Sequence, residues 1–457
     1  MPQIYFDITD IIQYAKRNDR VTGIQRVELN VIAETIRSQT SASVRGLVRS
    51  NQGESYRVVD LSFLAQKSEF VASDFLSHTD SVSDGFWPDK LLVRKYLDRY
   101  RNKKTLRILK KWEIYLEALT ARSRLAQKGL IIDRVQPNSN SKQPQNHHLC
   151  ADDVYVALGT GWDDPNSLRV ATQHRARGGK VALMIHDMIP VVRADLHMPK
   201  VCVNFGSWIS RAAECASLFL CVSNHTKKDL QNYLMTRSSD TPIVVTPLAH
   251  EFHGYPRGQV VSLADNASDA IKRRQNQRFI LCVGSLEARK NIARLLHAWT
   301  QVRQELGKTD VQLLFAGRRG WMIENFEAEM RKTGAVNGSV AVIENTTDHE
   351  LAWLYQHSLF TVYPSLYEGW GLPVGESLWF NTPCVASSAT SIPEVGGDLV
   401  DYFAPEDAAT LTATIARFLT RPELLEKRRH QIRQSELRTW ANHATDVMNA
   451  IIAHTND

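Results

Sequence analysis

The sequence predicts an α/β fold with two doubly wound parallel sheets. From residue 153 onward, short apolar runs alternate with stretches of helical length, which is typical of parallel strands joined by crossover helices. Glycines and charged residues directly follow several of these runs, at the strand ends where such sheets bind ligands. The chain of 457 residues is long enough for two or three domains, each with its own core.

The first half of the chain supplies the first predicted sheet. Residues 4–6 predict its first strand, and Gly23 lies near the start of a helix that runs to about residue 36. A helix start of this kind often presents backbone amides to a phosphate. The other predicted strands are residues 154–158, 181–185, 218–222 and 243–245. His186 follows one of these strands directly, although a lone histidine at such a place is often only structural.

The second predicted sheet begins with residues 279–284, which end in Gly284. Arg289 and Lys290 follow at the start of the next helix, where a planar guanidinium and a compact ammonium suit a diphosphate. Adjacent cations are also common on protein surfaces, so the pair alone does not establish a diphosphate site. Two further strands, residues 313–316 and 340–345, end at Gly317 and Asn345.

Residues 359–394 are the stretch around which the site is organised. A predicted strand, residues 359–363, leads through a glycine-rich turn into a predicted helix, residues 373–380. Glu368 lies in the turn and Glu376 in the helix. Carboxylates accept from hydroxyls, while amides at a helix start donate to phosphate, so this turn suits a ligand that carries both groups. The alternative is a pair of ordinary surface acids beside a tight turn.

Several motifs together resemble those of the retaining GT-B glycosyltransferases of the family-four type. They are E-G-W-G-L-P-V-G-E-S-L, T-P-C-V-A-S, I-P-E-V-G-G-D, H-D-M-I-P and G-S-L-E-A-R-K-N. The resemblance covers about residues 4–36 and most of 153–450. It implies the GT-B architecture, with two doubly wound Rossmann-like domains facing a cleft.

The resemblance also implies roles for particular residues. Glu368 would face the hydroxyls of the transferred sugar, Glu376 would hold the ribose, and His186 would lie near the anomeric carbon. Arg289 and Lys290 would hold the diphosphate and, with Glu368 and His186, make up the catalytic set. The remaining positions expected to line the nucleotide-sugar site are Gly23, Gly284, Gly317, Asn345, Gly369, Gly371 and Leu372.

The function implied is transfer of a hexose to a hydroxyl of a glycan or lipid-linked acceptor in surface polysaccharide synthesis. Mannose is the sugar suggested by association, and the donor is a nucleoside diphosphate sugar in its GDP or UDP form, with no further cofactor. The expected domains are residues 1–255 on the acceptor side, 276–435 on the nucleotide-sugar side, and a helix over 436–457 that crosses back. A GT-B epimerase or phosphorylase and a non-catalytic nucleotide-sugar binder are the alternatives.

Composition narrows the remaining classes. Apolar residues make up 43% and charged residues 23%, as in soluble globular proteins, and no run is long enough to cross a membrane. The first residues lack a secretory pattern, so we expect a cytoplasmic protein. The six cysteines form no C-x-x-C pair and the histidines show no ligand spacing; we therefore expect buried free thiols and no metal.

Residues 90–128 hold thirteen Lys or Arg against three acids, within an expected insertion at about 88–150. This basic segment is consistent with one or two amphipathic helices. A solvated basic face and an anionic membrane surface, reached from the cytoplasmic side, are the two main interpretations. Nothing here resembles a nucleic-acid-reading motif, so we expect no nucleic-acid partner. The following residues, 135–148, predict a loop.

Overall fold

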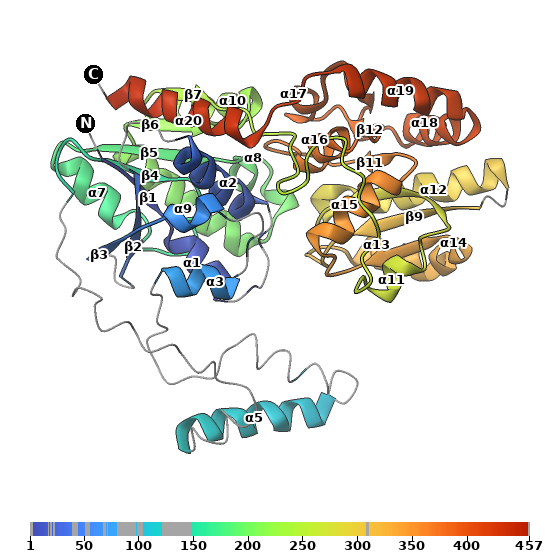
Figure 1. Ribbon diagram of the computed structural model, residues 1–457, viewed down its shortest axis with the longest axis horizontal. Helices are drawn as coiled ribbons and strands as arrows, with labels where there is room; N and C mark the ends of the chain where they lie inside the picture. Colours follow the sequence, from blue (N-terminus) through green and yellow to red (C-terminus); the bar gives the residue numbers. More distant parts are fainter. Residues whose placement is uncertain are drawn as a thin grey trace. The chain divides into compact units, whose positions relative to one another are not determined.

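The computed structural model (Figure 1) describes residues 3–38, 44–50, 55–66, 70–79, 97, 104–120 and 149–455, except residues 17, 19, 20, 22, 71, 308 and 309. The chain divides into two compact units. The first comprises Met1–Gly161 and Asn166–Lys180, and the second Trp162–Pro165 and Val181–Asp457. The domain bounds expected from the sequence stay predictions. The loop predicted over 135–148 and most of the basic insertion lie outside the described residues.

Strands of the first unit follow the order β3-β2-β1-β4. β1 (Ile4–Asp7) pairs in parallel with β2 (Val44–Arg49) and β4 (Val154–Ala157), whereas β3 (Tyr56–Val59) is antiparallel to β2. The sequence predicted neither β2 nor β3. The helices described in the first unit are α1 (Thr9–Ala15), α2 (Ile24–Arg37), η1 (Ser62–Gln66), α3 (Ala72–His78), α5 (Lys104–Thr120) and α7 (Arg169–Ala176).

The second unit holds two sets of parallel strands. β5 (Lys180–Ile185), β6 (Leu218–Cys221) and β7 (Ile243–Val245) are neighbours in this order. The other set runs in the order β10-β9-β8-β11-β12-β13, and every neighbouring pair is parallel. Its strands are β8 (Arg278–Val283), β9 (Val311–Ala316), β10 (Val340–Ile343), β11 (Thr361–Tyr363), β12 (Cys384–Ser387) and β13 (Asp401–Phe403).

Helices connect these strands in chain order. Between β5 and β8 lie α8 (Ile189–Val192), η2 (Ala194–Leu196), α9 (Pro199–Cys215), α10 (Asn224–Met235) and α11 (Asp269–Lys272). From β8 to β11 lie η3 (Ala288–Lys290), α12 (Ile292–Leu306), α13 (Glu324–Lys332), α14 (Gly334–Gly338) and α15 (Asp348–His357). The rest are α16 (Leu372–Trp379), α17 (Ile392–Gly396), η4 (Gly397–Leu399), α18 (Ala408–Thr420), α19 (Pro422–Gln434) and α20 (Trp440–Thr455).

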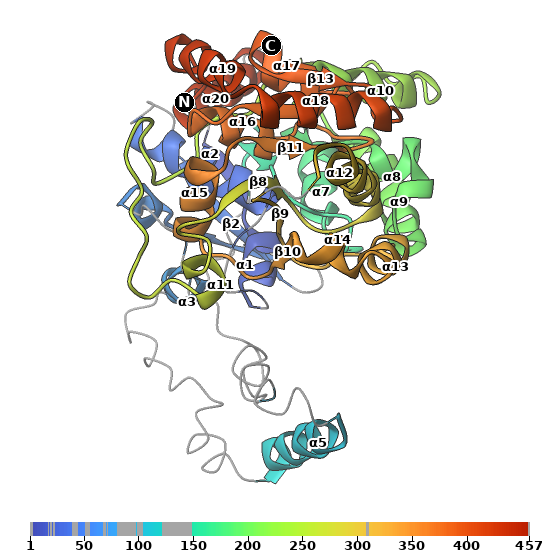
Figure 2. The ribbon, with the colours of Figure 1, turned by 90° about the vertical axis from the view of Figure 1, so that its right-hand side faces the viewer.

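Both faces of the six-stranded set are buried. Successive residues of β8 alternate between two hydrophobic clusters: Ile280 belongs to the cluster that contains Trp299 of α12, and Phe279 to the one that contains Trp353 of α15. Figures 1 and 2 show α12 and α15 on opposite faces of β8 and β9. A sheet covered on both sides needs continuous apolar strands, which is why apolar runs predicted β8, β9, β10 and β11. β12 and β13 were not predicted.

Local signals in the sequence fix several helix starts. The side chain of Ser223 accepts a hydrogen bond from the Thr226 amide and caps α10. Thr347 and Glu350 form a reciprocal capping box on α15. α16 carries Pro373 in its first turn, in agreement with the helix predicted over residues 373–380. The last helix, α20, begins at Trp440 and packs against β6.

Two other predictions concern single residue types and hydropathy. Four of the six cysteines are free and buried as expected: Cys215, Cys221, Cys282 and Cys384. Cys150 and Cys202 are free as well, but Cys150 is exposed and Cys202 is only partly buried, so the prediction of burial was wrong for these two. None of the helices in the described ranges combines the length and the apolar character that crossing a membrane requires.

Candidate functional site

The site lies where the strand order of the six-stranded set reverses. β8 continues to β9 and β10 on one side, while its other neighbour, β11, leads to β12 and β13. The segments that follow β8 and β11 therefore begin at adjacent strand ends. In doubly wound sheets, ligands bind at such a switch point. The sequence-predicted cations follow β8, and Glu368 follows β11.

Arg289 and Lys290 belong to η3, a single 3₁₀ turn between β8 and α12. Asn291 ends this turn in the left-handed conformation, with φ of 56°, which asparagine tolerates better than most residues. Its side-chain amide donates to the carbonyls of Pro364 and Pro405 at 3.1 and 3.0 Å. These bonds tie the turn to the segments that follow β11 and β13.

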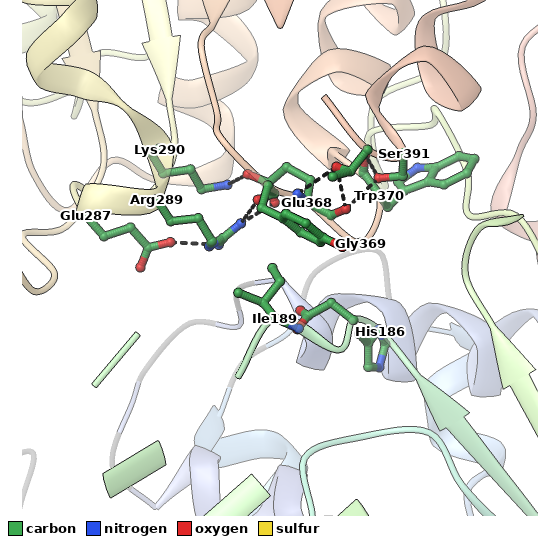
Figure 3. A network of polar contacts seen from close by, with 12 residues as sticks. His186, Ile189, Glu287, Arg289, Lys290, Glu368, Gly369, Trp370 and Ser391 are labelled. Carbon is green, nitrogen blue, oxygen red and sulfur yellow. Dashed lines mark hydrogen bonds and ion pairs between the residues drawn. The ribbon is translucent and has the colours of Figure 1, made fainter. Parts of the chain in front are cut away.

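Glu368 accepts one hydrogen bond from each cation. Its Oε2 is 2.5 Å from Arg289 Nη1, and its Oε1 is 2.6 Å from Lys290 Nζ (Figure 3). Arg289 also donates through Nη2 to Glu287 at 2.7 Å, and Lys290 donates to the Tyr363 hydroxyl at 2.7 Å. We call these five residues the Glu368 network. The structure thus brings together three of the four residues of the predicted catalytic set.

Counter-charges decide the ionisation of Glu368. Burial alone opposes a charged carboxylate, but Arg289 and then Lys290 more than offset it and lower the pKa of Glu368 to about 2. Burial likewise opposes the charge on Arg289, whereas Glu368 and Glu287 raise the pKa of its guanidinium. Glu368 and Arg289 are therefore ionised at neutral pH. The Glu368 network as a whole pairs two acids with two cations.

This balance changes the expectation drawn from the cations alone. The sequence predicted that Arg289 and Lys290 bind a diphosphate. In the structure, both cations are paired with the carboxylates of Glu287 and Glu368. Hydrogen-bonding capacity remains nevertheless: the described bonds use three of the five N–H groups of Arg289 and two of the three of Lys290. Each oxygen of Glu368 also keeps acceptor capacity for a hydroxyl. The network can thus bind an anion and a hydroxyl side by side.

The glycine turn after Glu368 touches the segment after β5. A Cβ added to Gly369 would lie 1.8 Å from the His186 carbonyl oxygen, so only glycine fits. Thr226 places its hydroxyl 3.3 Å from the carbonyl oxygens of both Gly369 and His186. Gly371, at φ of 121°, precedes Leu372, the first residue of α16. Residues far apart in the sequence therefore meet at this turn.

Further bonds join the Glu368 loop and α17 to α10, the helix that follows β6. Tyr367 donates its hydroxyl to Asp229 of α10 at 2.6 Å. Glu394 of α17 accepts from the backbone amides of Asn224 and His225 at 2.7 and 2.9 Å, at the start of α10. A carboxylate at a helix start is favoured by the helix dipole. These contacts fix the loop that carries Glu368 against α10.

His186 lies beside the same glycine turn. Its backbone faces Gly369, and Figure 3 shows its ring directed away from the Glu368 network. The imidazole of His443 in α20 is completely buried, and its pKa is lowered to about 3 by burial, by Arg438 and by His186. The His186 ring is thus within electrostatic reach of α20. Its place near an anomeric carbon stays a prediction.

The remaining predicted positions follow strand ends or helix starts. Glu376 is buried in α16 and accepts from the Tyr355 hydroxyl at 2.7 Å. The side chain of Lys290 lies against Gly284, and the amide of Gly317 donates to the Ile343 carbonyl. Asn345 is left-handed, at φ of 62°. Gly23, in the first unit, caps α2 at φ of 49°. Their ligand-binding roles are predictions.

Sequence reasoning missed three residues of the site. Glu287 is only 2% exposed and holds Arg289, although it lies inside a motif that the sequence analysis quoted. Tyr363 ends β11 and receives Lys290; burial and then Glu368 raise its pKa. Asp187, the second residue of the H-D-M-I-P motif, has its pKa raised by burial against the opposing effect of Arg289. An acid two residues before adjacent cations was the available signal for Glu287.

Comparison with known protein families places this geometry in context. Residues 264–437 match the family model described as "Glycosyl transferases group 1". The matched segment includes η3, β11 and α16, so it contains the whole Glu368 network.

Curated relatives of the chain are mannosyltransferases by name. The chain is 30% identical over 248 residues to O-antigen chain mannosyltransferase B of Escherichia coli, covering 53% of this chain and 62% of that one. It is 25% identical over 294 residues to the serotype-specific mannosyltransferase WbdA of Escherichia coli, covering 63% and 35%. The chain therefore spans less than two thirds of the length of these relatives.

Solved structures resemble the whole chain in fold. Sucrose-phosphate synthase from Thermosynechococcus elongatus matches with a TM-score of 0.57 at 15% identity, and 99% of each chain is covered. Anabaena HepE in complex with UDP-glucose matches with a TM-score of 0.57 at 12% identity, covering 99% of this chain and 100% of that one. Together with the two sets of parallel strands, these matches confirm the predicted GT-B fold class.

Proposed function

We propose that this protein is a retaining glycosyltransferase that moves mannose from a nucleoside diphosphate sugar to a hydroxyl of a glycan in bacterial surface polysaccharide synthesis. The observation that carries the proposal is the Glu368 network at a strand-order reversal inside the segment that matches the group 1 glycosyl transferase family. The names of the curated relatives support mannose. GDP-mannose is accordingly the first donor to test, with UDP sugars as the alternative.

In this proposal, the remaining N–H groups of Arg289 and Lys290 bind the diphosphate. The nucleoside diphosphate leaves with the electron pair of the bond to the anomeric carbon. The acceptor hydroxyl supplies the oxygen of the new bond, and its proton passes to the oxygen of the departing diphosphate. Donors that are already oriented stabilise the developing charge without further rearrangement. Glu368 orients the sugar through its unused acceptor positions. Retention of configuration is proposed from the family resemblance.

The acceptor is the less specific part of the proposal. We assign a glycan or lipid-linked glycan acceptor, in keeping with the O-antigen names of the relatives, and a location at the cytoplasmic face of the membrane. Transfer is proposed to need no metal, because Arg289 and Lys290 keep N–H groups that can donate to the diphosphate. Equal rates with a chelator and with added Mg²⁺ are the expected result.

A panel of nucleotides and nucleotide sugars tests the donor. A ligand at 100 times its dissociation constant adds about 2.7 kcal/mol to the free energy of unfolding, a shift that a thermal melt resolves. We expect GDP and GDP-mannose to raise the melting temperature, and ADP to leave it unchanged. Release of GDP only when a glycan acceptor is present would separate a transferase from an epimerase or a phosphorylase. Absence of any nucleotide-induced shift would contradict the proposal.

Lys290→Ala tests the diphosphate role directly. Removing one preoriented donor costs about 10² to 10³ in rate, so transfer should fall by that factor. Lys332→Ala is the matched control, because the Lys332 side chain is 78% exposed and its Nζ lies 3.8 Å from Glu329 Oε2, beyond hydrogen-bond distance. Steady-state transfer with the identified donor is the measurement. Near-wild-type turnover by a folded Lys290→Ala protein would refute the assignment.

A further inference from the structure

Helix α5 of the first unit exposes large apolar side chains on one face. Ile108, Leu109 and Trp112 are 58%, 64% and 65% exposed. Ile108 and Trp112 are one helical turn apart, and Leu109 lies beside them, so the three form one stripe. We call it the α5 stripe. Ile114, on another side of the same helix, is only 1% exposed, so the helix already has a covered side.

The stretch of sequence that contains the α5 stripe is strongly basic. Residues 90–128 hold thirteen Lys or Arg and three acids, a net charge of +10, and four of the cations belong to α5. Lys111, between Leu109 and Trp112, is itself exposed. A second copy of this helix would bring like charges together. An anionic surface with an apolar interior would satisfy both the cations and the stripe.

We propose that α5 is a membrane-docking helix that lies on an anionic lipid surface, with Ile108, Leu109 and Trp112 inserted among the lipid chains. Helices of this kind lie in the interface with their apolar face below the headgroups. Tryptophan favours this depth, and the cations pair with anionic headgroups. A solvated basic face, the main alternative from the sequence, leaves the exposed stripe unexplained.

This helix lies outside residues 264–437, so the proposal concerns a part of the chain that the match to the glycosyl transferase family does not cover. Binding to lipid does not depend on catalysis. Only its purpose, which is to bring the enzyme to a lipid-linked acceptor, rests on the proposed function. Nucleotide binding and lipid binding can therefore fail separately.

Vesicle flotation of the full chain tests the proposal. The vesicles contain either phosphatidylcholine alone or equal parts of phosphatidylcholine and phosphatidylglycerol. We expect the wild type to float with the anionic vesicles, less so as salt rises, and to stay behind with the neutral ones. The triple variant Ile108→Ser, Leu109→Ser, Trp112→Ser should bind anionic vesicles at least about tenfold more weakly.

A control variant isolates the α5 stripe from exposed apolar surface in general. Val203 of α9 and Met235 of α10 are 71% and 76% exposed, so Val203→Ser, Met235→Ser removes similar side chains elsewhere. It should float like the wild type. Both variants should melt like the wild type and keep the nucleotide-induced shift, which shows that folding and donor binding are intact.

Four outcomes would overturn the proposal. They are no flotation of the wild type with anionic vesicles at low salt, equal binding to neutral vesicles, unchanged binding of the triple variant, and equal loss in the control variant. Retention of a DNA duplex at physiological salt, lost on replacing the α5 cations by Gln but not in the triple variant, would instead assign the segment to nucleic acid.

Discussion

Two groups of buried charges, one in each unit, show how differently similar burial can act on a carboxylate. In the first unit, Asp7, Asp10 and Glu28 lie close together with Arg49, which donates to Asp7 at 2.5 Å. We call them the Asp10 cluster. In the second unit, the Glu368 network has two acids and two cations. Both groups lie at the ends of parallel strands.

The two groups differ in the pKa values of their carboxylates, and the cause is the ratio of acids to cations and not the extent of burial. Burial raises the pKa of Asp10 to about 6, with a further contribution from Asp7, whereas the pKa of Glu368 is about 2. Burial and then Asp10 also raise the pKa of Glu28, whose oxygens have no hydrogen-bond donor within the described part of the chain. The Asp10 cluster thus holds protons that the Glu368 network does not.

Arg289→Ala should break the balanced network with the largest effect on stability. It leaves Glu287 without this partner and Glu368 with Lys290 alone, both in buried positions. Removing one partner of a buried ion pair costs about 3 to 5 kcal/mol. The free energy of unfolding in urea measures the loss.

Arg278→Ala is the exposed counterpart of this change. Arg278 and Asp310 are 3.1 Å apart, with side chains 52% and 67% exposed. A surface pair of this kind contributes at most about 1 kcal/mol. If the two variants lose the same stability, the Glu368 network is not the buried, mutually dependent group described above.

The effect of Asp10→Asn on the free energy of unfolding should change with pH in the opposite sense from that of replacing a carboxylate whose pKa is lowered by folding. A pKa raised in the folded state means that the stability contributed by Asp10 is complete below about pH 4 and is lost as pH rises through about 6. Asparagine cannot ionise, so the variant should gain on the wild type over this range, by about 1 to 3 kcal/mol. Urea unfolding at several pH values measures the difference.

Asp60 provides a control of opposite sign in the same unit. Bonds from Ser62 lower the pKa of Asp60, so its contribution is present above about pH 4 and is lost on acidification. Asp60→Asn should therefore lose stability relative to the wild type as pH rises. A flat difference between Asp10→Asn and the wild type from pH 4 to 7 would show that Asp10 is not held protonated.

The Glu368 network was predictable from the sequence to a large extent because its members follow strand ends. Apolar runs fixed β8 and β11, and the order of a doubly wound sheet makes their ends neighbours, so Arg289, Lys290 and Glu368 could be expected together. The contact between Glu287 and Arg289 could not be predicted in this way. It depends on η3, a single 3₁₀ turn, and no periodic pattern in the sequence specifies such a turn.

The Asp10 cluster could not be predicted, for a related reason. Asp10, Glu28 and Gly159 are distant in the sequence, and only the pairing of β1 with β4 brings their segments together. The Thr160 amide donates to Asp10 at 2.7 Å. Nothing in the local sequence distinguishes these acids from surface residues. The exposure of the α5 stripe was also hidden, because an apolar pattern does not say which residues find a covering partner.

Glu287→Gln is the smallest change and the most informative about charge balance. Glutamine can still accept from Arg289, but the Glu368 network gains a net positive charge. A diphosphate should then bind about fivefold more tightly, which is about 1 kcal/mol, while turnover falls if Arg289 is less firmly held. Calorimetry with GDP and the separate effects on kcat and KM measure this. Glu406→Gln, at a side chain 75% exposed and paired with Arg294, should change neither. Weaker GDP binding by Glu287→Gln would mean that Glu287 acts by orienting Arg289 and not by neutralising it.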